Sequence, residues 1–135
     1  MAVLIDTGAF TAYRNKKDVY HEKADRLLRR ALKGEFSTIY TTDYIYDEAL
    51  TLAVVRTGNK EIATDISNVI SSPRIEMIMI DENILEQATT LFFKFFDKRI
   101  SFTDATTMAV MQHNGIDKII TFDAHFKGMF DVLCE

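Results

Sequence analysis

The sequence of 135 residues contains only one cysteine, Cys134, and one proline, Pro73. A single cysteine excludes an intramolecular disulfide, and its place near the C-terminus favours a small buried side chain over a nucleophile. Proteins that rely on no disulfide are typical of reducing compartments, so we expect a cytoplasmic location.

Long apolar runs are also missing. None approaches the ~20 residues of a membrane-spanning helix, and no basic segment precedes an apolar one at the N-terminus, so we expect neither a membrane span nor a signal peptide. No internal repeat, low-complexity tract or linker is visible. With 47% hydrophobic and 27% charged residues, the composition and length favour one globular domain spanning residues 1–135.

An excess of positive charge is missing as well. The net charge is −4, which argues against a uniformly basic nucleic-acid-binding surface. The charge is uneven, because residues 1–35 carry eight Lys and Arg against five Asp and Glu, whereas residues 36–135 carry eight against fifteen. The cations from Arg14 to Lys33 could form a local edge that contacts phosphates. A solvated helix face explains the run from Lys23 to Lys33 better.

Apolar runs alternate with helical patterns along the chain. We expect strands at residues 2–5, 37–42, 75–80, 118–122 and 131–134. We expect helices capped by Thr7, Asp18, Asp43 and Asp81, and two more helices near residues 60–71 and 101–115. Gly34, Gly58 and Gly115 are placed to end helices. This alternation predicts an α/β fold, a three-layer α/β/α sandwich with a mostly parallel sheet.

Two of the predicted strands end at an acid. Residues 2–5 are apolar without alternation, as in a strand buried on both faces, and stop at Asp6. Residues 119–122 stop at Asp123. Because parallel strands end at one rim of the sheet, where ligand sites lie, the two carboxylates can meet if the strands are neighbours. Each Asp could instead cap the helix or turn that follows it.

Two further acids lie on predicted helices. Glu48 shares a stripe with Ile45, Ala49, Leu52 and Val55, and Glu is rarely buried without a partner. It is preferred over Asp47, which shares its side with polar and apolar residues alike. Asp104 follows Ser101 by three residues, a weak capping box. That motif places Asp104 in a first helical turn at the sheet's rim, where a metal ligand would also be needed.

Acids gathered at one rim would repel one another. Two carboxylates ~4 Å apart repel by about 4 kcal/mol at an effective dielectric near 20, so protons or a cation must intervene. Oxygen ligands select hard cations such as Mg²⁺ or Mn²⁺. Sites of this kind orient phosphates and activate a water for in-line attack.

Taken together, these segments resemble the PIN domain family, and in size the chain is similar to its VapC-type toxin ribonucleases. The resemblance rests on the order and spacing of residues 3–7, 42–48, 101–105 and 120–126, with residues 21–24 similar to the family's second helix. It covers nearly the whole chain.

The resemblance implies a five-stranded sheet in the order 3-2-1-4-5. It implies that Asp6, Glu48, Asp104 and Asp123 surround one or two Mg²⁺ or Mn²⁺ ions in a metal-dependent endoribonuclease, where an activated water cleaves RNA phosphodiesters. Asp123 matches a position that varies in the family. A homodimer and, for the toxin branch, a small antitoxin that blocks the acidic site are also implied.

Other functions are less compatible with these residues. A haloacid-dehalogenase-type phosphatase would need a second Asp two residues after Asp6, where Gly8 stands. A receiver domain would need a pair of acids at the end of the first strand, where Asp6 stands alone, although Asp81 could imitate the phosphoacceptor at the end of the third strand. A catalytically silent PIN-like binding module is the alternative outside the enzymes.

Histidines and phenylalanines complete the set of expectations. His21, His113 and His125 have no metal-ligand spacing, and each is expected to be structural, with His125 the one to examine for a substrate contact. In the helix after Asp81, Phe93 and Phe96 lie outside the main apolar face. They suggest burial on more than one side or an oligomer contact.

Overall fold

A five-stranded parallel sheet forms the centre of the molecule, as seen in the computed structural model, which describes all of residues 1–135. The strands are β1 (Ala2–Ile5), β2 (Thr38–Thr42), β3 (Ile75–Ile78), β4 (Lys118–Ile120) and β5 (Asp131–Leu133). Their order is β3-β2-β1-β4-β5, and every pairing is parallel. The predicted sheet and strand order are confirmed, and the sheet is wholly rather than mostly parallel.

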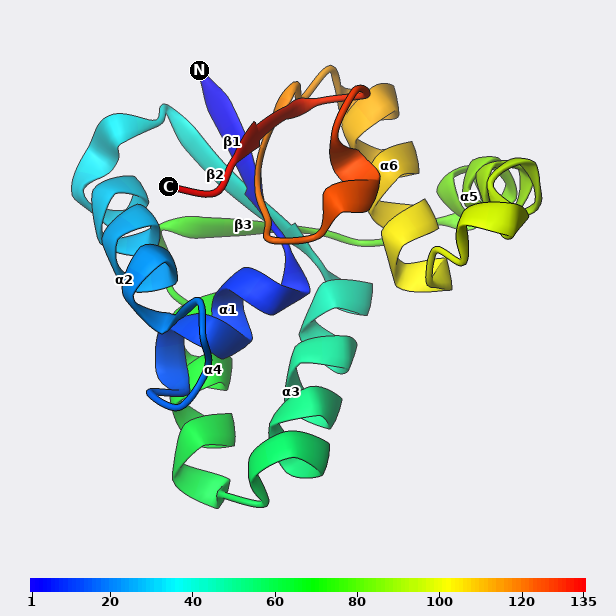
Figure 1. Cartoon of the computed structure of the whole chain (residues 1–135). Helices are drawn as coiled ribbons and strands as arrows, with labels where there is room; N and C mark the ends of the chain where they lie inside the picture. Colours follow the sequence, from blue (N-terminus) through cyan, green and yellow to red (C-terminus); the bar gives the residue numbers. More distant parts are fainter.

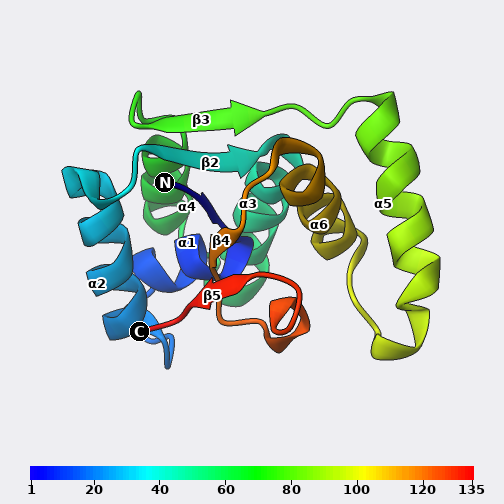
Figure 2. The same ribbon diagram turned by 90° about the horizontal axis from the view of Figure 1, so that it is seen from above.

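Two groups of helices flank the sheet and complete the predicted three-layer sandwich (Figure 1). The helices are α1 (Thr7–Arg14), α2 (His21–Arg30), α3 (Asp43–Thr57), α4 (Lys60–Ile70), α5 (Glu82–Lys94) and α6 (Phe102–Asn114). Helices α1 to α4 pack among themselves, and α5 packs on α6. Figure 2 shows α5 at the outer edge of the molecule, far from α2. None of the helices is both long and apolar enough to cross a membrane.

Strand β1 occupies the middle of the sheet. It pairs with β2 on one side and β4 on the other, and Val3, Leu4 and Ile5 are fully buried. Burial on both faces explains why the strand has no apolar–polar alternation. The pairing of β1 with β4 brings the residues after Ile5 and after Ile120 to the same rim.

Three predicted helix caps are wrong. Asp6, not Thr7, caps α1. Asp18 does not cap α2, which begins at His21; its Oδ1 instead accepts the Tyr20 N–H at 2.9 Å in the preceding turn. Thr42, not Asp43, caps α3, because the strand ends in extended backbone at Thr42 and its hydroxyl accepts the third N–H of the helix.

Other helix ends agree with the sequence. Asp81 caps α5 through the Ile84 N–H, and Ser101 caps α6 in a complete capping box. Gly58 and Gly115 end α3 and α6 with φ of 58° and 63°, a region that costs other residues strain. The chain after α2 continues as a π-helical turn until Gly34, whose φ of 102° leaves the helical region, as predicted for the residue that ends this helix.

Two predicted apolar faces are only partly buried. Val55 is 74% exposed, so the predicted stripe on α3 is wrong at that position, and the helix buries Ala53 instead. Phe93 on α5 and Phe96 in the 3-10 turn that follows it are 66% and 61% exposed. A second buried face of α5 within this chain is therefore excluded.

Candidate metal centre and substrate cleft

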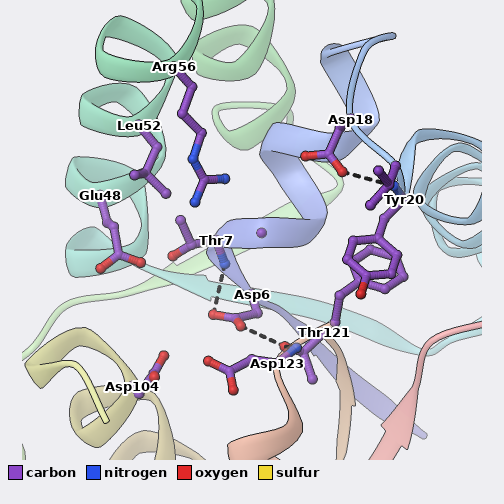
Figure 3. Close-up of a pocket in the computed structure, with 13 residues that line it drawn as sticks. Asp6, Thr7, Asp18, Tyr20, Glu48, Leu52, Arg56, Asp104, Thr121 and Asp123 are labelled. Carbon is purple, nitrogen blue, oxygen red and sulfur yellow. Dashed lines mark hydrogen bonds between the residues drawn. The ribbon is translucent and has the colours of Figure 1, made fainter. Parts of the chain in front are cut away.

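The four predicted acids line one cleft of about 570 Å³ at the carboxyl rim of the sheet. Asp6 and Asp123 follow β1 and β4, Glu48 projects from α3, and Asp104 lies in the first turn of α6 (Figure 3). The remaining lining residues are Thr7, Gly8, Asp18, Val19, Tyr20, Leu52, Arg56, Thr121 and Phe122. Segments far apart in the sequence therefore meet at one acidic surface.

Both carboxylate oxygens of Asp6 are held in place. Oδ1 accepts the Thr7 N–H at 2.8 Å, which makes Asp6 the N-cap of α1. Oδ2 accepts the Thr121 hydroxyl at 2.7 Å. The side chain is only 4% exposed. Asp6 therefore both caps α1 and lines the acidic cleft, two roles that the sequence alone left as alternatives.

Asp104 is fixed by the capping box at the start of α6. Its N–H donates to Ser101 Oγ at 3.0 Å, and its Oδ2 accepts the Ser101 N–H at 3.4 Å. The residue is 7% exposed. Because the box holds the carboxylate on the first helical turn, its other oxygen remains available to the cleft.

Asp123 is bound to its own loop and to His125. Its N–H donates to Thr121 Oγ1 at 3.0 Å, and its Oδ1 accepts the His125 N–H at 2.8 Å. The Nδ1 atom of His125 lies 2.9 Å from Asp123 Oδ1 and 3.7 Å from Asp104 Oδ2, without an aligned hydrogen bond. Asp104, Asp123 and His125 thus form a compact group whose ligand atoms lie within 4.8 Å of one another.

The three histidines therefore differ in their roles. His21 Nδ1 lies 2.7 Å from the Ala12 carbonyl oxygen, as expected of a structural residue. His113 is exposed on α6, outside the acidic cleft. His125 lies inside the acidic cluster, which its spacing from other ligands in the sequence did not indicate. The available signal was its position two residues after Asp123.

Glu48 faces the acids from the opposite wall of the cleft (Figure 3). It is half-buried, whereas the neighbouring Asp47 is exposed and lies outside the cleft. Leu52 and Arg56 follow on the same side of α3, each one turn further along. Arg56 was missed in the sequence, although its spacing of eight residues from Glu48 places it on that face.

An aromatic pair forms another part of the wall. The rings of Tyr20 and Phe122 stack with centroids 4.6 Å apart and planes 4° apart. Both line the cleft, and Phe122 directly precedes Asp123. Tyr20 lies in the turn before α2, and no periodic pattern in the sequence connects that turn to the acids, so Tyr20 could not be predicted as a cleft residue.

The acids raise one another's pKa values. Burial, followed by the charges of Asp123 and Glu48, raises the pKa of Asp6 to about 6, although the hydrogen bonds from Thr121 and Thr7 act in the opposite direction. Burial and the charges of Asp6 and Asp123 raise the pKa of Asp104 to about 8. The protein alone therefore lacks the positive charge needed to keep Asp104 ionised at neutral pH, and it makes the ionisation of Asp6 less favourable than that of an ordinary Asp.

This charge deficit and the ligand chemistry both fit a divalent cation. Carboxylate oxygens are the donors that Mg²⁺ and Mn²⁺ prefer, and the single imidazole does not change that preference. The compact group consists of Asp104, Asp123 and His125. Asp6 is close enough to raise the pKa of Asp104, and Glu48 lies further across the cleft.

The family model described as "PIN domain" matches residues 3–129 of the chain. A protein from Archaeoglobus fulgidus named "VapC ribonuclease" is 30% identical over 129 residues, which cover 93% of this chain and 80% of that protein. The "23S rRNA-specific endonuclease VapC20" of Mycobacterium tuberculosis is 28% identical over 125 residues, which cover 92% of this chain and 91% of the relative.

Solved structures show the same fold. The M. tuberculosis VapC20 crystal structure, described as a sarcin–ricin loop cleaving toxin, has a TM-score of 0.82 at 27% identity and covers 92% of both chains. A chain of the Rickettsia felis VapBC2 complex with promoter DNA has a TM-score of 0.70 at 18% identity, with 98% of this chain and 97% of that chain covered. The second similarity supports the fold alone.

Proposed function

The chain belongs to the PIN domain family, and from this premise we propose that it is a divalent-metal-dependent endoribonuclease, the toxin of a toxin–antitoxin pair. The observation that carries the proposal is the convergence of Asp6, Glu48, Asp104 and Asp123 on one cleft. Two of these acids have pKa values raised so far that a bound cation is the natural counter-charge.

Asp6, Asp104 and Asp123 would hold the ion or ions, with Glu48 contributing from the opposite wall. A bound Mg²⁺ or Mn²⁺ would supply the positive charge that orients a phosphodiester and activates a water for in-line attack. The same four acids are the residues for which we propose a catalytic role, because each would contact the ion or the reacting groups.

Neighbouring groups hold these acids in position. The Thr121 hydroxyl and the Thr7 N–H fix both oxygens of Asp6, and the capping box fixes Asp104. The backbone N–H of His125 donates to Asp123 Oδ1 at 2.8 Å and orients that carboxylate. Preorganised groups of this kind reduce the cost of arranging the site during each turnover.

The relatives guide the proposals on substrate and partners. The relatives' names, "VapC ribonuclease" and "23S rRNA-specific endonuclease", support RNA as the substrate and 23S rRNA as the first one to test. A similar structure described as "Toxin-antitoxin complex from Klebsiella pneumoniae" and the description of VapC20 as a toxin support a small antitoxin as the proposed partner. We also propose a homodimer, a single domain over residues 1–135 and a cytoplasmic location, which size measurement and cell fractionation would test.

The test of the reaction is RNA cleavage by the purified protein. Labelled RNA oligonucleotides and intact 23S rRNA are incubated with Mg²⁺, Mn²⁺ or EDTA, and the products are separated on a denaturing gel. We expect metal-dependent internal cleavage that Asp6→Asn and Asp104→Asn abolish. Asp47→Asn is the matched control, because this exposed acid lies beside Glu48 but outside the cleft. Cleavage that persists equally in both cleft variants would refute the site assignment.

The alternative of a catalytically silent binding module gives a different result in the same samples. Such a module would cut no RNA with any metal. If the module also does not bind metal through these acids, Mn²⁺ binding measured by calorimetry would be the same in wild type and Asp6→Asn. Metal binding that depends on Asp6, without cleavage, would preserve the metal centre and reject the ribonuclease activity for the substrates used.

A further inference from the structure

A second cleft of about 570 Å³ adjoins the acidic one. Arg56 lines both clefts. Three more cations line the second cleft, Arg14 at the end of α1 and Lys16 and Lys17 in the loop that follows, against a single acid, Glu61. The two clefts thus have opposite charge and meet at one arginine.

None of the four cations of this basic cleft forms an ion pair, although other cations of the chain do. Arg29, Arg30, Lys23 and Lys118 pair with Asp25, Glu35, Glu135 and Asp131. The basic edge expected between Arg14 and Lys33 is therefore divided, since much of the α2 part is neutralised locally. Most other Lys and Arg residues of the chain are also unpaired, so what distinguishes these four is that they line one cleft with a single acid. In a chain with net charge −4, this clustering favours an anionic ligand.

Arg14 is prepared for such a ligand. Its guanidinium lies 4.3 Å from the ring centroid of Tyr13, which is only 7% exposed and so gives a fixed platform. Its Nε is buried and has no hydrogen-bond partner. A stacked guanidinium loses less conformational freedom on binding phosphate than a mobile lysine does.

Arg56 connects this basic surface to the acids. It follows Glu48 by two turns of α3, about 12 Å along the helix axis. Figure 3 shows its guanidinium extending from α3 towards Thr7, next to Asp6. A chain of phosphates that leaves the acidic cleft on this side would therefore reach Arg56 before Arg14 and the two lysines.

We propose that the basic cleft of Arg14, Lys16, Lys17 and Arg56 binds the sugar–phosphate backbone of the RNA on one side of the scissile phosphodiester. The inference rests on the proposed ribonuclease function and adds the substrate's path to it. The acidic cleft repels a polyanion, so a separate group of cations must supply the affinity while the acids act on one phosphate. Contacts to the backbone also allow binding that does not depend on base sequence.

Binding measured without cleavage tests the cleft. Fluorescence anisotropy follows a labelled single-stranded RNA oligonucleotide in EDTA, across a series of salt concentrations. Lys16→Gln/Lys17→Gln removes two exposed loop cations, and Lys94→Gln/Lys98→Gln on the distant α5 side removes the same charge as a control. Each lost phosphate contact lowers the salt slope by about 0.7, so we expect a decrease of about 1.4 and roughly tenfold weaker binding at low salt.

The control variant should keep the wild-type slope and an affinity within about twofold, and Arg56→Gln should weaken binding like the loss of one contact. Equal affinity in wild type and the loop variant, equal losses in both double variants, or no RNA binding by the wild type would each overturn the proposal. So would a loop variant that keeps its RNA affinity but loses binding to a polyglutamate peptide, which would assign the cleft to an acidic protein segment.

Cleavage in Mn²⁺ is measured separately on the same proteins. If the loop variant shows the expected loss of RNA binding while the wild type cuts nothing, the basic cleft stands and the ribonuclease function fails. If the wild type cuts RNA and the loop variant binds and cuts equally well, the function stands and the basic cleft fails.

Discussion

The buried acids should make the metal-free protein less stable as pH rises. Asp6 and Asp104 have folded-state pKa values of about 6 and about 8, against 3.8 for an ordinary Asp. A raised pKa means that the folded protein holds the proton more tightly than the unfolded chain does. The contribution of these two acids to stability is therefore fully present below pH 4, and it decreases as pH rises through the two raised pKa values.

The size of this decrease follows from the shift. For Asp6, the pKa rises from 3.8 to about 6, and at 1.36 kcal/mol per unit this corresponds to about 3 kcal/mol of lost stability at pH 8. Asp104 shifts in the same direction and further, so it adds to the loss. Since small domains have only about 5–15 kcal/mol in total, the effect is large enough to measure.

Urea unfolding followed by circular dichroism measures it directly. The protein is unfolded in EDTA at intervals between pH 4 and 8, and again at pH 8 with Mn²⁺ in place of EDTA. We expect the unfolding free energy to fall by at least about 3 kcal/mol over this range. Mn²⁺ should restore most of it, because a bound cation favours ionised carboxylates and stabilises only the folded state.

Variants separate these acids from the other titrating groups. Asp104→Asn should flatten the pH profile in EDTA and lose most of its stabilisation by Mn²⁺, whereas Asp47→Asn should behave as wild type because Asp47 is exposed. If the unfolding free energy of the wild type in EDTA stays level or rises between pH 4 and 8, the pKa values of Asp6 and Asp104 are not raised in the folded protein. The electrostatic argument for the metal centre would then fail.

Three further predictions concern single positions. Glu48→Gln should reduce kcat for RNA cleavage at least tenfold while Asp47→Asn leaves it unchanged, and equal kcat values would remove Glu48 from the site. Thr121→Val should lower the unfolding free energy at neutral pH by about 1–3 kcal/mol, because a buried oxygen of Asp6 loses its donor, with Thr121→Ser close to wild type. Phe93→Ser/Phe96→Ser should change the unfolding free energy by less than about 1 kcal/mol, since both rings are more than 60% exposed; a larger loss that depends on protein concentration would show that the rings are buried between copies.

Strand β1 and its acid could be predicted because their signals are local. A run without alternation reports burial on both faces, and an acid at the end of a central parallel strand lies at the ligand rim. Glu48 was recognisable because a charged residue interrupts an apolar helical stripe. The Thr42 cap was missed since Thr42 and Asp43 are both good caps, and only the end of the strand decides between them.

The rest of the site depends on contacts between segments that no local pattern connects. Tyr20 joins the cleft by stacking on Phe122, a partner about a hundred residues away in the sequence. His125 carries no ligand spacing, and only the approach of Asp104 turns its loop into part of the acidic cluster. Tyr20 therefore becomes visible only when the tertiary fold is known, whereas the position of His125 two residues after Asp123 indicated a possible substrate contact but not its approach to Asp104.

Helix α3 contributes a residue to each of the two oppositely charged clefts, Glu48 to the acidic one and Arg56 to the basic one. Glu48 and Arg56 face one side of α3, so the helix presents a negative and then a positive group along one path. A site built only of acids could hold a cation but would repel RNA, and a site built only of cations could bind RNA but would not hold the ion. Placing both on one rigid helix fixes their separation, so in the proposed complex one phosphate at the acids and others at the cations would be selected together.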